Sequence, residues 1–163
     1  MNTIIPSLHA LNALEAIDFY KKVFNAKLES HNAFDSTMTQ GMDLPDDFDF
    51  SKSTLHAEIS INGEFLFISD DLENSLKPNG RVEITIIPSS LQMIESFYNN
   101  AVNAGAEVVV KLEKQFWGDY FCRFTDPFGI GWQLNFSPPK EPEKVQQKNS
   151  SNKKTSKKKK RKK

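Results

Sequence analysis

The chain has little of what several large classes of protein require. It contains one cysteine, Cys122, so no disulfide can form within the chain and a disulfide-rich secreted fold is excluded. No apolar run approaches the roughly 20 residues that span a bilayer. A signal peptide is not expected, because the N-terminus lacks a basic region and Glu15 and Asp18 interrupt its apolar residues early. We therefore expect a soluble, cytoplasmic protein.

Net charge is also absent, but only as an average over the whole chain. There are 21 basic and 21 acidic residues, yet 12 basic and two acidic ones lie in 140–163. The remaining nine basic and 19 acidic residues lie in 1–139, so the two segments carry opposite charges of ten units. Nearly all apolar residues lie in the acidic segment. We expect one globular domain over 1–137, followed by a disordered, lysine-rich tail over 138–163.

An internal repeat gives the organisation of the globular part. Residues 17–29 recur 78 positions later as 95–107, with Phe-Tyr, Asn-Ala and Glu in register. Both copies have apolar residues at helical spacing, and both follow a run with strand character. A type I′ turn at Asn62-Gly63 and a longer turn at 126–129 each separate two further strands.

Each half therefore reads as βαβββ, and the halves cover about 1–71 and 80–137. The first half is longer between its strands, and we assign the extra length to a polar loop over 35–53. The expected strands are 4–11, 27–34, 55–61, 64–69, 81–87, 106–114, 120–125 and 130–136.

Strand parity predicts that one face of the sheet is apolar and the other polar. Trp132 and Leu134 share one face of their strand, whereas Gln133 lies on the other. In the same way His56 and Glu58 lie opposite the apolar residues of their strand. The apolar faces must pack under the two helices. The polar face is then either solvated surface or the inside of a cup.

Three groups of segments carry a resemblance to a known family. They are 16–26, His56-Ala57-Glu58-Ile59 with Asn62-Gly63 and Ile68-Ser69-Asp70, and Phe116-Trp117-Gly118-Asp119-Tyr120 with Thr125-Asp126-Pro127-Phe128-Gly129 and Trp132-Gln133-Leu134. In these segments the chain resembles the vicinal oxygen chelate superfamily of glyoxalase I, bleomycin-resistance proteins and extradiol dioxygenases, and within it the PhnB-like branch. This resemblance implies an α+β fold with a cupped, mostly antiparallel eight-stranded sheet, helices on the outer face, and a homodimer. It also implies that the protein is either a bivalent-metal enzyme or a metal-free binding protein.

The resemblance also implies where metal ligands would lie. The corresponding positions fall on Phe67, Gln133 and Arg81, and near Ile5, with His9 further along that face. Phenylalanine and arginine cannot ligate a metal, and glutamine is a weak neutral donor. We therefore expect that the standard metal site is missing and that no cofactor is bound.

A displaced metal site stays open as an alternative. His56 and Glu58 share a face, and His9 or Glu83 could complete a set of ligands. The competing interpretation is that His56 and Glu58 bond to each other or to Arg81 inside a polar pocket.

Four other side chains have simpler interpretations. Trp117 is either a stacking platform for a planar ligand or an aromatic lid at the edge of the cup. Trp132 is expected in the core, Cys122 as an inert core or pocket-lining residue, and His31 as exposed. The residues expected to bind ligand are His9, His56, Glu58, Phe67, Arg81, Glu83, Trp117 and Gln133.

The leading functional hypothesis is the binding of a small organic ligand without the family's usual metal. Arg81 would pair with an anionic or carbonyl group, and Phe67 and Trp117 would supply apolar walls. One alternative is a metal-dependent lyase, isomerase or dioxygenase that uses His56 and Glu58, so whether the protein is an enzyme stays open. Another is non-specific nucleic-acid association through Lys153–Lys163, whose charges suit phosphates.

Overall fold

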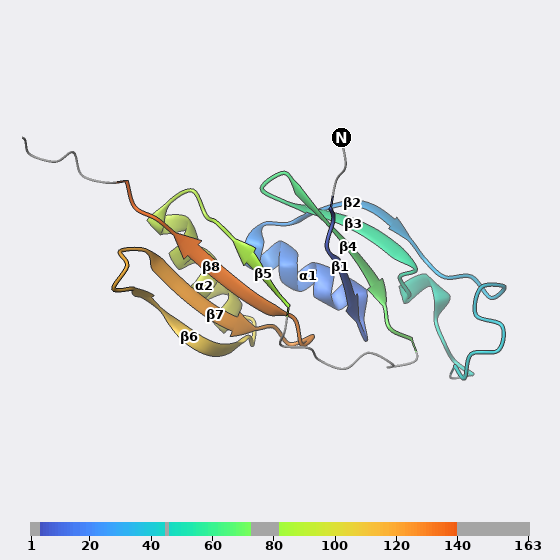
Figure 1. Cartoon of the computed structure of the whole chain (residues 1–163). Helices are drawn as coiled ribbons and strands as arrows, with labels where there is room; N and C mark the ends of the chain where they lie inside the picture. Colours follow the sequence, from blue (N-terminus) through green and yellow to red (C-terminus); the bar gives the residue numbers. More distant parts are fainter. Residues whose placement is uncertain (1–3, 45, 73–81, 140–163) are drawn as a thin grey trace, which may run out of the picture.

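A computed structural model describes residues 4–44, 46–72 and 82–139 of the protein (Figure 1). The tail expected beyond Ser137 lies outside the described residues from position 140 onward, and so does Arg81. The first module contains β1 (Ser7–Ala10), α1 (Ala13–Phe24), β2 (Lys27–Asn32), η1 (Phe50–Lys52), β3 (His56–Ile61) and β4 (Glu64–Asp70). The second contains β5 (Glu83–Ile86), α2 (Leu91–Asn103), β6 (Glu107–Lys114), β7 (Tyr120–Thr125) and β8 (Gly131–Phe136).

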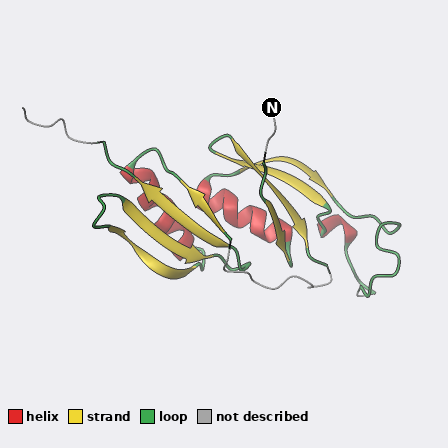
Figure 2. Ribbon diagram, viewed as in Figure 1, coloured by secondary structure: helices red, strands yellow, loops and turns green. Residues whose placement is uncertain are grey.

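The strands form two four-stranded sheets with the same topology. Their orders are β1-β4-β3-β2 and β5-β8-β7-β6, so the two βαβββ modules are confirmed. In each sheet the first strand pairs in parallel and the other pairs are antiparallel. The sheets lie side by side with β1 and β5 as neighbouring edges, and the helices lie behind the strands (Figures 1 and 2).

The expected eight strands all occur, but they do not form one continuous sheet. Among the described residues no ladder joins β1 to β5, so the eight strands divide into two open sheets of four. The α+β class and the helices on one face are as expected. The described residues of the insertion over 35–53 form turns at 36–41 and 46–47, irregular segments, and the single turn η1 near its end. No helix in the described segments has the length and hydropathy needed to cross a membrane.

Local sequence signals explain the element boundaries. Asn12 caps α1 by accepting a hydrogen bond from the Glu15 backbone N–H, and Ser90 caps α2 through the Met93 N–H. The β3–β4 turn is the expected type I′ turn, because Asn62 and Gly63 have φ values of 53° and 89°. Gly105, at φ 95°, follows the end of α2, where a left-handed residue commonly ends a helix.

One hydrophobic core serves both modules. The apolar face of β3, β4, β7 and β8 lies against the helices, and Trp132 is fully buried, as parity predicted. Cys122 is also fully buried, which agrees with the core alternative of the two expected for it. Helix α1 reaches into the second module, because the Phe24 ring lies 4.6 Å from Trp132 and 5.5 Å from Phe97 between centroids. The helix of the first module therefore packs against the sheet of the second.

A buried carboxylate fixes this contact. Oδ2 of Asp126 accepts hydrogen bonds from the Tyr20 hydroxyl at 2.8 Å and the Trp132 indole at 2.9 Å. Oδ1 accepts the backbone N–H groups of Phe128 and Ile130, both at 2.9 Å. Burial raises the pKa of Asp126, while the four donors oppose that rise. Burial and the adjacent Asp126 charge raise the pKa of Tyr20.

Removing the Tyr20 hydroxyl should destabilise the protein. Tyr20→Phe leaves Asp126 with three donors, and loss of a hydrogen bond to a buried charged group costs about 1.5–3 kcal/mol. Tyr98 occupies the equivalent position in α2 and is half-buried. Tyr98→Phe is thus the matched control, expected to cost less than about 0.5 kcal/mol. Urea unfolding of both variants measures the difference, and equal losses would show that the Tyr20–Asp126 bond is not a specific link.

Candidate functional site

The face of the first sheet that points away from the helices carries polar and aromatic side chains. His9, on β1, lies beside Ser69, on β4, and their Nδ1 and Oγ atoms are 2.9 Å apart. His56, on β3, meets the Phe67 ring edge-on at a centroid distance of 4.7 Å. Glu58 is the direct register partner of Phe67. Three neighbouring strands therefore present two imidazoles, a hydroxyl, a carboxylate and a ring on one face.

The same face of the second sheet carries an ion-pair cluster. Oε1 of Glu83 accepts hydrogen bonds from Nε of Arg123, at 3.1 Å, and from its Nη2. Oε2 accepts a hydrogen bond from the side-chain amide of Gln133. These bonds, first from Arg123 and then from Gln133, hold the pKa of Glu83 below its ordinary value. The cluster joins β5, β7 and β8.

A glycine makes room for this cluster. Gly131, on β8, is the register partner of Glu83, and a Cβ atom built there would lie 2.9 Å from Cγ of Glu83. The Glu83 side chain therefore crosses β8 directly over Gly131. Any larger residue at this position would displace the carboxylate from Arg123 and Gln133.

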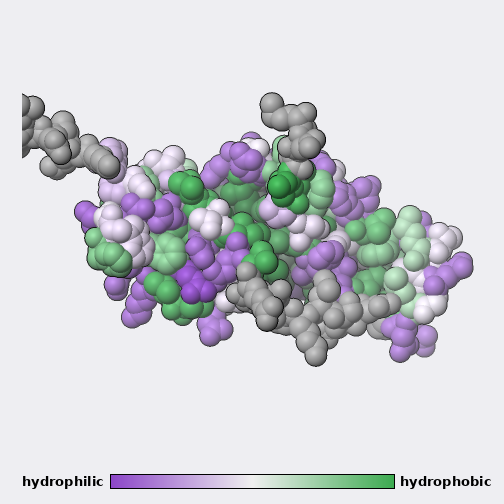
Figure 3. Space-filling view, viewed as in Figure 1, coloured by the Kyte–Doolittle hydropathy of each residue, from purple (hydrophilic) through white to green (hydrophobic). Residues whose placement is uncertain are grey.

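Aromatic side chains flank the cluster at one end of the second sheet. Phe121 shares the face of Arg123 on β7. The Trp117 ring lies 6.0 Å from Phe121 and 4.9 Å from Phe116, and its side chain is about half exposed, with a relative accessibility of 50%. The tryptophan thus lies in the loop between β6 and β7, beside the strand face. Hydrophilic and apolar residues are interspersed across the two sheets in Figure 3.

Most of the residues predicted for the site lie on this face, which we call the open face. The structure places His9, His56, Glu58 and Phe67 together on the first sheet, and Glu83 with Gln133 on the second. Among the described residues, no hydrogen bond joins His56 to Glu58; His56 contacts Phe67 instead. Arg81 lies outside the described residues. Whether any of these residues binds a ligand remains a prediction.

Sequence reasoning missed three participants. Arg123 forms the ion pair with Glu83, and Ser69 forms a hydrogen bond with His9. Gly131 has no side chain and so leaves room for the Glu83 side chain to cross β8. Strand parity could have indicated Arg123, because this residue lies between the core residues Cys122 and Phe124 and so must face away from the helices.

The expectation that His31 is exposed was wrong. His31 is half-buried rather than exposed, because its Nε2 lies 3.1 Å from the hydroxyl of buried Thr54.

The residues present do not fit the family's metal site. Of the implied positions, Phe67 offers no donor atom, and Gln133 directs its amide N–H to Glu83. The Glu83 carboxylate already binds a guanidinium group, which is a fixed positive charge. Among the described residues, no three His, Cys, Asp or Glu side chains gather into a set that would hold an ion.

Cys122 does not contribute chemistry to the site. It is buried on the helix side of β7, and burial raises the pKa of its thiol to about 12. A thiol with that pKa remains protonated at neutral pH and is a poor nucleophile.

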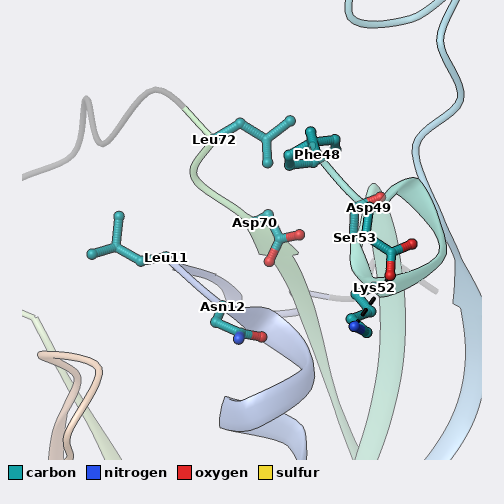
Figure 4. A pocket seen from close by; sticks show the side chains of 8 residues that line it. All are labelled: Leu11, Asn12, Phe48, Asp49, Lys52, Ser53, Asp70 and Leu72. Carbon is teal, nitrogen blue, oxygen red and sulfur yellow. Dashed lines mark ion pairs between the residues drawn. The ribbon is translucent and has the colours of Figure 1, made fainter. Parts of the chain in front are cut away.

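A separate hollow of about 210 Å³ lies where the insertion meets the start of α1 (Figure 4). Its polar groups hold the chain together. Oδ1 of Asp70 accepts the Ala13 N–H at 2.7 Å, Oδ2 accepts the Thr54 N–H at 2.6 Å, and Lys52 pairs with Asp49 at 3.2 Å. We interpret the hollow as a structural junction. It is lined by Leu11, Asn12, Phe48, Asp49, Lys52, Ser53, Asp70 and Leu72.

Two βαβββ modules with helices on one side and a polar open face on the other define a paired-module protein. The chain belongs to the Glyoxalase/Bleomycin resistance protein/Dioxygenase superfamily, whose family model matches residues 12–134. This confirms the family resemblance found in the sequence.

Individual relatives agree with the family assignment. The uncharacterized protein Rv0887c of Mycobacterium tuberculosis is 33% identical over 136 residues, which cover 79% of this chain and 71% of that one. Protein PA1353 of Pseudomonas aeruginosa superposes with a TM-score of 0.65 at 26% identity, covering 84% and 98% of the two chains. The PhnB protein of Bacillus cereus has a TM-score of 0.68 at 18% identity, covering 83% and 100%, and shows the shared fold.

The junction role of Asp70 predicts a loss of stability on amidation. In Asp70→Asn one oxygen becomes an NH₂ group that faces a backbone N–H, and an unsatisfied buried donor costs about 1–3 kcal/mol. Asp47→Asn, an exposed change in the same insertion, is the control and should be nearly neutral. Denaturant unfolding tests this, and equal stability of the two variants would argue against a structural role.

The lowered pKa of Glu83 predicts a pH-dependent contribution to stability. An acid whose pKa falls on folding stabilises the protein above its ordinary pKa, and that stabilisation disappears as the pH falls through the folded value. Wild type should therefore exceed Glu83→Gln in unfolding free energy at pH 7, and the gap should narrow below about pH 4.5. Glu64→Gln, an exposed change on β4, is the control. A gap that stays constant between pH 7 and pH 3 would contradict the ion-pair account.

Proposed function

We propose that the protein binds a small organic ligand on its open face, in the manner of a binding protein rather than through the family's standard metal site. The observation that carries the proposal is the Glu83–Arg123–Gln133 cluster. It gives the second sheet fixed hydrogen-bonding groups at a position where the family resemblance implies a metal ligand. His9, His56 and Phe67 supply further polar and aromatic contacts on the first sheet.

The contact chemistry supports an organic ligand. Small-molecule sites combine aromatic or apolar walls with a few polar groups held in place by their neighbours. On the first sheet Ser69 restrains the His9 ring, and Phe67 packs against His56. On the second sheet Arg123 is held at two nitrogens. Held side chains lose little conformational freedom on binding, which favours affinity.

The proposal also covers the oligomeric state, the location in the cell and the role of the tail, and these three parts do not rest on the open face. The family resemblance supports a homodimer, and the single cysteine supports a cytoplasmic location. The charges of Lys153–Lys163 support weak, salt-sensitive association with nucleic acid as a separate property of the tail. A displaced metal site at His56 and Glu58 is the competing function, and metal content measured on chelator-free protein separates it from ligand binding.

Binding should depend on Phe67. In Phe67→Ala the aromatic wall beside His56 is lost, and removal of that aromatic contact should weaken binding at least tenfold. The measurement is a chemical-shift titration of the full chain with fragments from a mixed polar and aromatic library. The matched control is Phe65→Ala. Phe65 lies on the same strand and face as Phe67 but further from His56, so its removal should weaken binding less.

Two results would contradict the proposal. The first is a library in which no fragment shifts the signals of open-face residues. The second is the finding that the protein holds a stoichiometric metal ion, that a His56→Ala, Glu58→Ala double variant loses this ion, and that fragment binding requires it.

A further inference from the structure

We propose that the Glu83–Arg123–Gln133 cluster recognises a 2-hydroxycarboxylate that carries an apolar ring, and that Arg123 takes the role of specificity-determining residue. This inference rests on the proposed function, because it names the class of ligand for the same open face. It also follows from the mismatch between these residues and a metal site. Three independent features of the cluster point to this class of ligand.

The first feature is the number of N–H groups that Arg123 still offers. A guanidinium group has five N–H donors in one plane. Glu83 takes one at Nε and one at Nη2. No other hydrogen bond from Arg123 is found among the described residues, so three donors remain available on a side chain that is 35% exposed. The free edge of the group matches the two oxygens of a carboxylate.

The second feature is an acceptor beside those donors. Gln133 directs its Nε2 to Glu83, which leaves the amide oxygen free of that contact. Arg123 and Gln133 are direct register partners on β7 and β8, so their side chains start about 5 Å apart. Because the two side chains start from paired positions, we infer that a hydroxyl on the carbon next to a carboxylate can donate to Gln133 while the carboxylate binds Arg123.

The third feature is an apolar wall next to the same donors. Phe121 lies two residues before Arg123 on the same face of β7, and the half-exposed Trp117 packs edge-on against it. A ring attached to the hydroxyl-bearing carbon can lie against this wall. The carboxylate of Glu83 does not repel such a ligand strongly, because Arg123 and Gln133 occupy both of its oxygens.

The test uses three probes that differ by one group at a time. Mandelate has the carboxylate, the hydroxyl and the ring, phenylacetate lacks the hydroxyl, and 1-phenylethane-1,2-diol lacks the charge. Each is titrated into the full-length protein in EDTA, and the side-chain signals of arginine and glutamine are followed by NMR. We expect mandelate to bind with a Kd of about 1 mM, as suits a ligand of this size. Phenylacetate should bind about fivefold more weakly and the diol at least tenfold more weakly.

A variant then tests the arginine itself. Arg123→Lys keeps the positive charge but loses the planar fork, and it should weaken mandelate binding at least tenfold. Lys22→Gln, a charge change on the exposed side of α1, is the control and should leave binding unchanged. Backbone spectra of both variants, compared with wild type, establish that each remains folded.

The outcomes separate this inference from the proposed function. Equal binding of mandelate and the diol, or full binding by a folded Arg123→Lys variant, would overturn the ligand class while leaving ligand binding on the open face intact. The mandelate titration is repeated without EDTA, and binding that is seen there but not in EDTA would overturn the role given to Arg123. If neither these probes nor the broader fragment library perturb the open face, both proposals fail.

Discussion

The arrangement of the two modules depends on one buried carboxylate, Asp126. Among the described residues the two sheets share no ladder, and a buried side-chain hydrogen bond from Tyr20 to Asp126 connects the modules. A buried carboxylate is costly unless it is fully hydrogen-bonded, and here four donors surround it. Tyr20 supplies one of those donors from α1, so the helix must dock at one place on the second sheet. Once α1 is docked in this way, the ring of Phe24, on the same helix, packs against Trp132 of the second sheet.

The repeat is asymmetric at this point, and that asymmetry gives the two modules different roles. The first module closes its last hairpin with Asn62-Gly63, which offers no carboxylate, whereas the second uses the longer turn that begins at Asp126. Tyr98, the counterpart of Tyr20, is accordingly only half-buried. The sheet faces that pack against the helices are apolar, so the polar residues concentrate on the open face. There the side chain of Glu83 crosses over Gly131 and reaches Arg123.

Sequence alone predicted the modules and the faces, but not the pairings across strands. The 78-residue repeat and the two-residue period of the strands are local patterns, so they located all eight strands and put Gln133 and Glu83 on the polar face. The partner of Glu83 depends on which residues of β7 lie beside β8, and a single sequence does not specify that register. The sequence therefore does not single out Arg123 as that partner. The separation of β1 from β5 likewise depends on how α1 docks against the second module. That docking is a contact between segments far apart in the sequence, so local patterns do not predict it.

Replacing a metal ion with an ion pair changes what a site can select. A bivalent ion attracts any oxygen ligand from all directions and polarises it strongly. Arg123 carries a single, delocalised charge whose long-range field Glu83 largely offsets, so affinity for a carboxylate comes mainly from direct, charge-assisted hydrogen bonds to the remaining N–H groups, and the directions of those bonds dominate. Under the proposed function, such a site would discriminate by the shape and spacing of the ligand's oxygens. An ion pair also polarises a bound oxygen less than a bivalent metal ion does, which is the reason for proposing binding rather than catalysis.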